Sequence, residues 1–120
     1  MPDYNPAVDG RPEPGEVVWA WVPFEAEGRE GKERPVLVLS VDGLRLRAVA
    51  MSTRTDDRDR RRREVWEDIG TGDWDRHARP SVVRVDHVLV VSVYDARRVG
   101  AYVEDQVLDD VRASVRRRSR

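Results

Sequence analysis

The sequence predicts a mainly β domain that ends in one amphipathic helix, and three observations lead to this prediction. Residues 16–22 (EVVWAWV) alternate along a strand, so that both faces of the strand can be buried. An Asp-Gly pair at 42–43 separates two apolar segments and is typical of a tight β-hairpin. Near the C-terminus the apolar residues change to helical spacing. Short antiparallel strands followed by a helix are therefore expected.

The first two predicted strands are joined by a long loop, and an arginine, Arg34, stands at the start of the second strand. Trp19 and Trp21 share one face of the first strand and are expected to pack in the core or at a dimer interface. Residues 23–33 form a polar, Gly-containing loop that is longer than a hairpin needs, which makes it a candidate functional loop. Arg34 follows this loop directly, at the start of the second apolar strand.

The Asp-Gly pair makes the second and third strands antiparallel neighbours. The third strand begins with Arg45 and Arg47 on one face, so this face is expected to be solvent-exposed and basic. The strand ends at Ser52, Thr53 and Arg54. Residues 55–63 contain no apolar side chain and should form an exposed loop.

The remaining segments alternate between strands and turns. Residues 64–69 suggest a short strand, and residues 70–80 form a turn-rich loop with an isolated Trp74. Residues 81–92 have the β-branched density of one or two strands. The final helix should close one end of the domain, and its acidic start and basic end match the helix dipole. Its apolar residues are Val103, Val107, Leu108, Val111 and Val115.

Composition limits the class of protein. A chain of 120 residues with 39% hydrophobic and 38% charged residues is expected to form one domain. We expect a disordered or extended N-terminal segment (1–14), a folded domain (15–115) and a basic tail (116–120). There is no cysteine, which excludes disulfides and thiolate metal sites. No apolar run approaches the roughly 20 residues of a membrane span, and the N-terminus lacks signal-peptide features, so a cytoplasmic location is expected.

The net charge of −1 hides a segregation of charge, because arginines concentrate at 54–63 and 112–120. These arginines can be solvated surface and a fraying tail. They can equally contact phosphates or an acidic partner peptide, since the arginine fork suits both ligands.

The segments GEVVW (15–19), GKERPVLVLS (31–40) and WEDIGTGDWDRHARPSVVRVDHV (66–88) follow one another with an order and spacing that resembles the PemK/MazF family of bacterial toxins, in its actinobacterial-like branch. The resemblance spans roughly residues 15–115. It implies a small SH3-like (CcdB/PemK-like) barrel of five to seven strands, made of a strongly bent antiparallel sheet with a C-terminal helix.

For function, the resemblance implies the toxin of a type II toxin–antitoxin system. Such a toxin is a sequence-specific endoribonuclease that cuts single-stranded RNA without a metal or cofactor, leaving a 2′,3′-cyclic phosphate and a 5′-hydroxyl. The resemblance further implies a homodimer whose groove binds RNA. A disordered acidic tail of the cognate antitoxin would occupy the same groove.

The candidate catalytic residues are Arg34, Ser52, Thr53 and His77. Arg34 is permanently charged and can stabilise the negative charge that develops on the phosphoryl oxygens. Ser52 stands where the family usually has threonine, with Thr53 as the alternative if the register shifts by one. Serine keeps the hydroxyl but lacks the methyl group that restricts the threonine rotamer.

The two histidines have different expected roles. His77 lies in the polar loop and has a suitable ordinary pKa for proton transfer, although a solvated loop histidine is the simpler interpretation. His87 is expected to pack within a strand. Neither histidine has a second ligand at suitable spacing, so no metal site is predicted.

Candidate RNA contacts come from cations and one aromatic residue. Trp74 can stack on an unpaired base or pack as a lid over the barrel. Two strand acids, Glu16 and Asp86, can orient Arg34 or a dimer arginine, or can be ordinary surface charges. The residues expected to contact RNA are Lys32, Arg54, Arg58, Trp74 and Arg76.

Two alternatives to a ribonuclease remain open at this point. A catalytically weak or inactive barrel would bind nucleic acid or a protein partner, because a fold alone never secures activity. A CcdB-like gyrase inhibitor would act by binding a protein, gyrase, and would not need Arg34 for its action. The GKERP segment at 31–35 therefore favours the ribonuclease.

Overall fold

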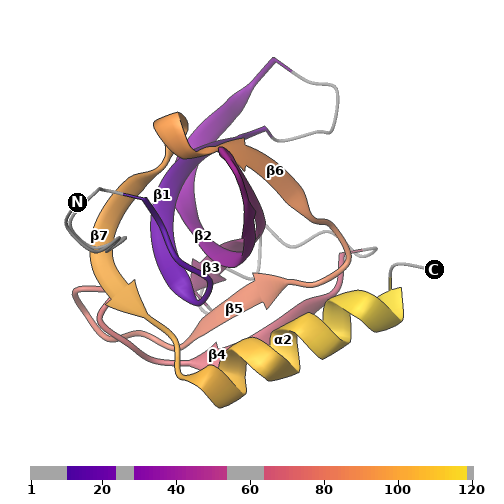
Figure 1. The fold of residues 1–120 in the computed structure, drawn as a ribbon. Coiled ribbons are helices and arrows are strands. Elements are labelled where there is room, and N and C mark those ends of the chain that lie inside the picture. The colour runs from indigo at the N-terminus through magenta and orange to yellow at the C-terminus, as the bar shows by residue number, and fades with distance from the viewer. Residues whose placement is uncertain (1–10, 24–28, 54–63, 119–120) are drawn as a thin grey trace, which may run out of the picture.

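The computed structural model describes residues 11–23, 29–53 and 64–118. Seven antiparallel strands form one sheet, and a single α-helix follows them in this part of the chain (Figure 1). No helix among these residues is long and apolar enough to cross a membrane. The elements are β1 (Glu16–Pro23), β2 (Gly31–Asp42), β3 (Arg45–Thr53), β4 (Trp66–Gly70), β5 (Ser81–Arg84), β6 (Leu89–Ser92), the 3₁₀ helix η2 (Val93–Asp95), β7 (Arg97–Tyr102) and α2 (Asp105–Arg118).

The sheet is strongly bent, and β3 is the strand at which it divides. The strand order is β4-β5-β3-β2-β1-β7, and β6 also pairs with β3. The first half of β3 (45–48) pairs with β6, whereas its last residues (51–53) pair with β5. Figure 1 shows the sheet curling round, with α2 lying beside β4 and β5. The predicted fold class, a mainly β bent sheet with a C-terminal helix, is confirmed.

Both faces of the central strands are buried, because successive side chains of a strand point to opposite sides. Val17 and Leu37 belong to a core cluster that α2 completes with Leu108 and Val111. Val18 and its neighbours on β2, β3 and β6 form a second cluster on the other face. The alternation that predicted two buried faces for the first strand is thus confirmed for its first half.

Local signals predicted most elements, with small differences at their ends. Asp42 pairs with Arg45, so the hairpin loop is Gly43-Leu44, one residue later than the predicted Asp-Gly turn, with Gly43 at φ 61°. Residues 81–92 form two strands, β5 and β6. The helix begins at Asp105, two residues after the first apolar position of its predicted pattern.

A buried ion pair joins β1 to β7. Glu16 is 0% exposed, and the Nε of Arg98 donates a hydrogen bond to its Oε2 at 2.5 Å. The backbone N–H of Glu13 donates to the other carboxylate oxygen at 2.9 Å. The hydrogen bond with Glu16 raises the pKa of Arg98 above its ordinary value. The hypothesis that Glu16 orients Arg34 is therefore wrong, because its carboxylate is used to hold β7.

We expect Glu16→Ala to lower the free energy of unfolding by about 3 kcal/mol, because it removes the buried carboxylate that accepts hydrogen bonds from Arg98 and from the Glu13 N–H. Urea unfolding followed by circular dichroism measures this change. Arg97→Ala is the matched control, since Arg97 makes an exposed ion pair with Glu33 that should contribute at most about 1 kcal/mol. A Glu16→Ala loss as small as that of the control would contradict the structural role of the buried pair.

Candidate active site

A pocket of about 330 Å³ lies where the ends of β2 and β3 meet β1 and the loop before β5. It brings together Lys32, Arg34, Ser52, Thr53 and Trp74, which the sequence predicted as site residues. It also contains residues that the sequence analysis did not assign to a site. The complete lining is Trp19, Lys32, Glu33, Arg34, Pro35, Met51, Ser52, Thr53, Trp74, Asp75, Arg79 and Ser81.

Strand register explains why these residues meet. Ala20 pairs with Arg34 across β1 and β2, and Val36 pairs with Ala50 across β2 and β3. The β2–β3 pairing ends at Val36 and Ala50, and Arg34 and Ser52 each lie two residues beyond this last pair on their own strands. The guanidinium of Arg34 and the hydroxyl of Ser52 therefore belong to the same end of the sheet.

Arg34 is half-buried, and its guanidinium makes no hydrogen bond or ion pair with any other residue of the described segments. Its five N–H donors are therefore available to a ligand. The Ser52 hydroxyl has only a long, 3.5 Å hydrogen bond to the carbonyl oxygen of Thr53. Both groups can thus donate to an anion that enters the pocket.

Trp74 forms one wall of the pocket and is held on three sides. Its ring packs against the core cluster that α2 completes. Its Nε1 donates to the Oγ of Ser81 at 3.0 Å. The ring also covers Gly72, where an added Cβ would lie 2.1 Å from a ring atom. The ring is thus packed against its own chain, and its stacking on an unpaired base stays a prediction.

Asp75 and Arg79 form a two-point ion pair on the same loop. The Nη2 of Arg79 donates to Oδ1 of Asp75 at 2.7 Å, and its Nε donates to Oδ2 at 3.0 Å. The backbone N–H of Arg79 donates to Oδ2 as well, at 2.7 Å. These hydrogen bonds, the side-chain bond first, hold the pKa of Asp75 well below its ordinary value. The pair is therefore ionised throughout the neutral pH range.

The two tryptophans of β1, which were expected to pack in the core or at a dimer interface, differ in their burial. Trp19 is half-buried and lines the pocket, with the Arg97 guanidinium 5.6 Å from its ring centroid. Trp21 is 47% exposed, so it does not belong to the core of the single chain. The Trp21 ring packs closely over Gly31, where an added Cβ would lie 2.7 Å from a ring atom.

Several candidates from the sequence lie away from this pocket. His77 and Arg76 are exposed on the loop between β4 and β5 and do not line the pocket. His87 is half-buried, beyond the end of β5. Arg54 and Arg58 lie outside the described residues.

Asp86 does not orient Arg34 either. Its Oδ1 accepts hydrogen bonds from Arg84 Nε at 2.9 Å and from the Val65 N–H at 3.1 Å. Burial alone would raise the pKa of Asp86, but these hydrogen bonds lower it overall. Its role is to join the segment before β4 to the end of β5.

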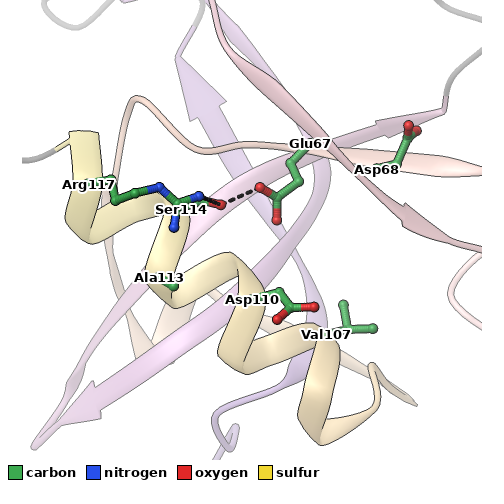
Figure 2. A pocket seen from close by; sticks show the side chains of 7 residues that line it. All are labelled: Glu67, Asp68, Val107, Asp110, Ala113, Ser114 and Arg117. Atoms are coloured by element: carbon green, nitrogen blue, oxygen red, sulfur yellow. Dashed lines mark hydrogen bonds between the residues drawn. The ribbon is translucent and has the colours of Figure 1, made fainter.

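A second pocket, of about 390 Å³, lies between β4 and α2 (Figure 2). Figure 2 shows Glu67 pointing toward Ser114, whose hydroxyl donates to it, while Arg117 donates to the same hydroxyl at 3.0 Å. Three carboxylates and one arginine line this pocket, so it would repel a phosphate. The lining residues are Glu67, Asp68, Val107, Asp110, Ala113, Ser114 and Arg117.

The residues that sequence reasoning missed had weak signals. Asp75 and Arg79 stand four residues apart within a turn-rich loop, a spacing at which opposite charges can pair if the loop forms a helical turn.

Within the described segments, no group of three His, Asp or Glu residues is arranged to hold a metal ion.

Comparison with known proteins gives two findings. The sequence model of the family described as PemK-like, MazF-like toxin of type II toxin-antitoxin system matches residues 13–118. The fold is similar to the crystal structure of MazF (Form-I) from Deinococcus radiodurans, with 22% identity, a TM-score of 0.61 and 94% of each chain covered. It is also similar to MazE-MazF (Form-II) from the same organism, with 21% identity, a TM-score of 0.58 and 94% of each chain covered. No curated protein sequence matches the chain.

We expect Gly72→Ala to displace Trp74, because the added Cβ would overlap the indole ring and the neighbouring wall would have to move. Overpacking of this kind costs about 1–3 kcal/mol. The measurement is the indole N–H resonance of Trp74 in a ¹H–¹⁵N spectrum, together with urea unfolding. Thr71→Ala, an exposed change on the neighbouring residue, serves as control. An unmoved Trp74 resonance in Gly72→Ala would show that the ring is not packed against this glycine.

Proposed function

The chain belongs to the PemK-like, MazF-like toxin family of type II toxin–antitoxin systems, and from this membership and the pocket around Arg34 we propose that it is a metal-independent endoribonuclease. Its substrate is single-stranded RNA, which it cuts within a specific short sequence. The observation that carries the proposal is the half-buried Arg34, which lies in one pocket with the hydroxyls of Ser52 and Thr53 and whose guanidinium has no protein partner among the described residues.

The chemistry follows from what such a pocket can stabilise. The ribose 2′-oxygen attacks the adjacent phosphorus and loses its proton, and the bond from phosphorus to the 5′-oxygen breaks as that oxygen gains a proton. The products are a 2′,3′-cyclic phosphate and a 5′-hydroxyl. Arg34 stabilises the extra negative charge on the phosphoryl oxygens, and the Ser52 or Thr53 hydroxyl donates a further hydrogen bond.

Proton transfer must come from the groups that line the pocket or from water. Two carboxylates are present, and Asp75 is committed to Arg79. Glu33 pairs with Arg97 at 3.6 Å, with both side chains more than half exposed, so this bond is easily exchanged. Glu33 is therefore the carboxylate that can accept a proton from the attacking hydroxyl. His77 is outside the pocket as the loop now stands and would need loop movement to take part.

The same pocket suits the acidic tail of a cognate antitoxin, because carboxylates and phosphates use the same arginine donors. The relative that was solved as a MazE-MazF complex supports this partner. We further propose a homodimer in the cytoplasm. The exposed Trp21 and Tyr102 on β1 and β7 are consistent with a subunit contact.

Two observations favour a second function. The pocket contains no histidine among the described residues, and Ser52 replaces the usual threonine. A barrel that binds RNA without cutting it would keep Arg34 and lose only turnover. The experiments below separate the two functions.

We expect Arg34→Ala to lower the cleavage rate by roughly a hundred- to a thousandfold, because a preorganised donor to the developing charge is lost. Purified protein is incubated with a long unstructured RNA in EDTA, and the cleavage ends are mapped. Arg47→Ala removes the same charge from the exposed start of β3 and should leave the rate unchanged. RNA cleavage that persists in Arg34→Ala, or that depends on added Mg²⁺, would contradict the proposal.

Paired substitutions at Ser52 identify the hydroxyl that takes part. Ser52→Thr should preserve or raise the rate, because the extra methyl group restricts the rotamer of the hydroxyl. Ser52→Ala should lower the rate by roughly a hundredfold if this hydroxyl contacts the phosphoryl group. The measurement is single-turnover cleavage of a labelled RNA. Full activity of Ser52→Ala, with loss in Thr53→Val, would move the role to Thr53.

A further inference from the structure

The side chain of Arg79 is placed in the pocket by its own loop. The side chain of Asp75, which forms an ion pair with Arg79, is only 11% exposed, whereas the side chain of Arg79 is 47% exposed. The carbonyl oxygen of Arg79 accepts a hydrogen bond from the Ser81 hydroxyl at 3.2 Å. That hydroxyl in turn accepts from the indole of Trp74. The guanidinium is therefore fixed through both its backbone and its side chain before any ligand arrives.

The pair leaves one edge of the guanidinium unused. An arginine has five N–H donors arranged on two edges, each of which can bind two oxygens at once. Asp75 takes the edge formed by Nε and Nη2. The edge formed by Nη1 and Nη2 has no partner within the described segments and belongs to a residue that lines the pocket. This edge fits two oxygens of a phosphate group.

A single strand of RNA presents a phosphate at every nucleotide, so a strand that places one phosphate at Arg34 brings its neighbours to the rest of the pocket. We propose that Arg79, held by Asp75, is a second phosphate ligand that binds a phosphate group next to the one at Arg34. This inference rests on the proposed ribonuclease function. Arg79 is then a substrate-binding residue, and Asp75 is the residue that positions it.

The negative charge of Asp75 makes it possible to distinguish a role in positioning Arg79 from a simple electrostatic attraction of Arg79 for RNA. Asp75 cancels much of the charge of Arg79 at long range, so removing Asp75 would strengthen a purely electrostatic attraction for RNA. A positioning role predicts the opposite, because Arg79 would lose its fixed orientation and would have to be ordered on binding. The Asp75→Asn variant therefore separates the two effects by the sign of the change.

The test measures binding of a 2′-O-methyl oligonucleotide of mixed sequence, which cannot be cut because its 2′-oxygen is blocked. Fluorescence anisotropy gives Kd in EDTA at several salt concentrations. Each phosphate contact to a single strand contributes about 0.7 to the slope of log Kd against log salt. We expect Arg79→Ala to reduce this slope by about 0.7 and to weaken binding at least about tenfold at low salt.

Three further variants sharpen the result. Arg79→Lys should keep the slope but bind more weakly than wild type, because lysine retains the charge without the planar fork. Asp75→Asn should also bind more weakly. Arg47→Ala removes one positive charge roughly 17 Å along β3 from Ser52 and should leave both slope and Kd unchanged. If Arg79→Ala does not fold, Arg79→Gln, which keeps an amide donor for Asp75, gives the same slope test.

The outcomes separate this inference from the proposed function. A wild-type slope in Arg79→Ala, or tighter binding by Asp75→Asn, would overturn the role of Arg79 even if the wild-type protein cuts RNA with cyclic phosphate ends. A wild-type slope with an altered cleavage sequence would overturn it as well and would assign Arg79 to base recognition. Wild-type protein that binds RNA but does not cut it would end the ribonuclease proposal, while a reduced Arg79→Ala slope would still support the phosphate contact. A wild-type protein that does not bind the oligonucleotide would overturn both.

Discussion

The division of β3 between two partner strands is the constraint on which the rest of this structure depends. One edge of β3 pairs with β6 over residues 45–48 and with β5 over residues 51–53. Because two strands share a single edge, the sheet must turn where the partner changes, between residues 48 and 51. The turn brings the end of β3, the loop before β5 and the start of β2 to one place, and the pocket forms there. The pocket is thus a consequence of strand pairing rather than of any single loop.

Much of this fold could be predicted from the sequence because its signals are local. The alternation in residues 16–22, the Asp-Gly pair and the helical spacing after residue 103 each involve neighbours along the chain. β7 was missed because its sequence, RRVGAY, has no clear alternation. Its place in the sheet depends on the contact between Arg98 and Glu16, which are 82 positions apart. No window of sequence contains such an interaction.

The residues of the candidate site also fall into two groups, those that local sequence signals predict and those that depend on contacts between distant segments. Arg34 and Ser52 could be predicted to share a pocket because a motif carries them and the paired strands β2 and β3 bring their ends to one place. The packing of Trp74 could not be predicted, because it rests on contacts with Gly72 and Ser81 across a turn. His77 was chosen for its ordinary pKa, a property of the residue type, whereas lining the pocket is a property of position. Arg79 was missed for the converse reason, since its type is common and only its placement is informative.

The charges of the pocket show how a chain with a net charge of −1 can suit a polyanion. Glu33 faces Arg97, and Asp75 is bound by Arg79, so both acids of the pocket have a cation of their own. Arg34 and Lys32 have no such partner among the described residues, and they set the local potential. The excess acid lies elsewhere, in part around the pocket between β4 and α2 (Figure 2). A ligand responds to the field at the groove it enters more than to the total charge, so the near-neutral composition of this chain is compatible with a site built for phosphate.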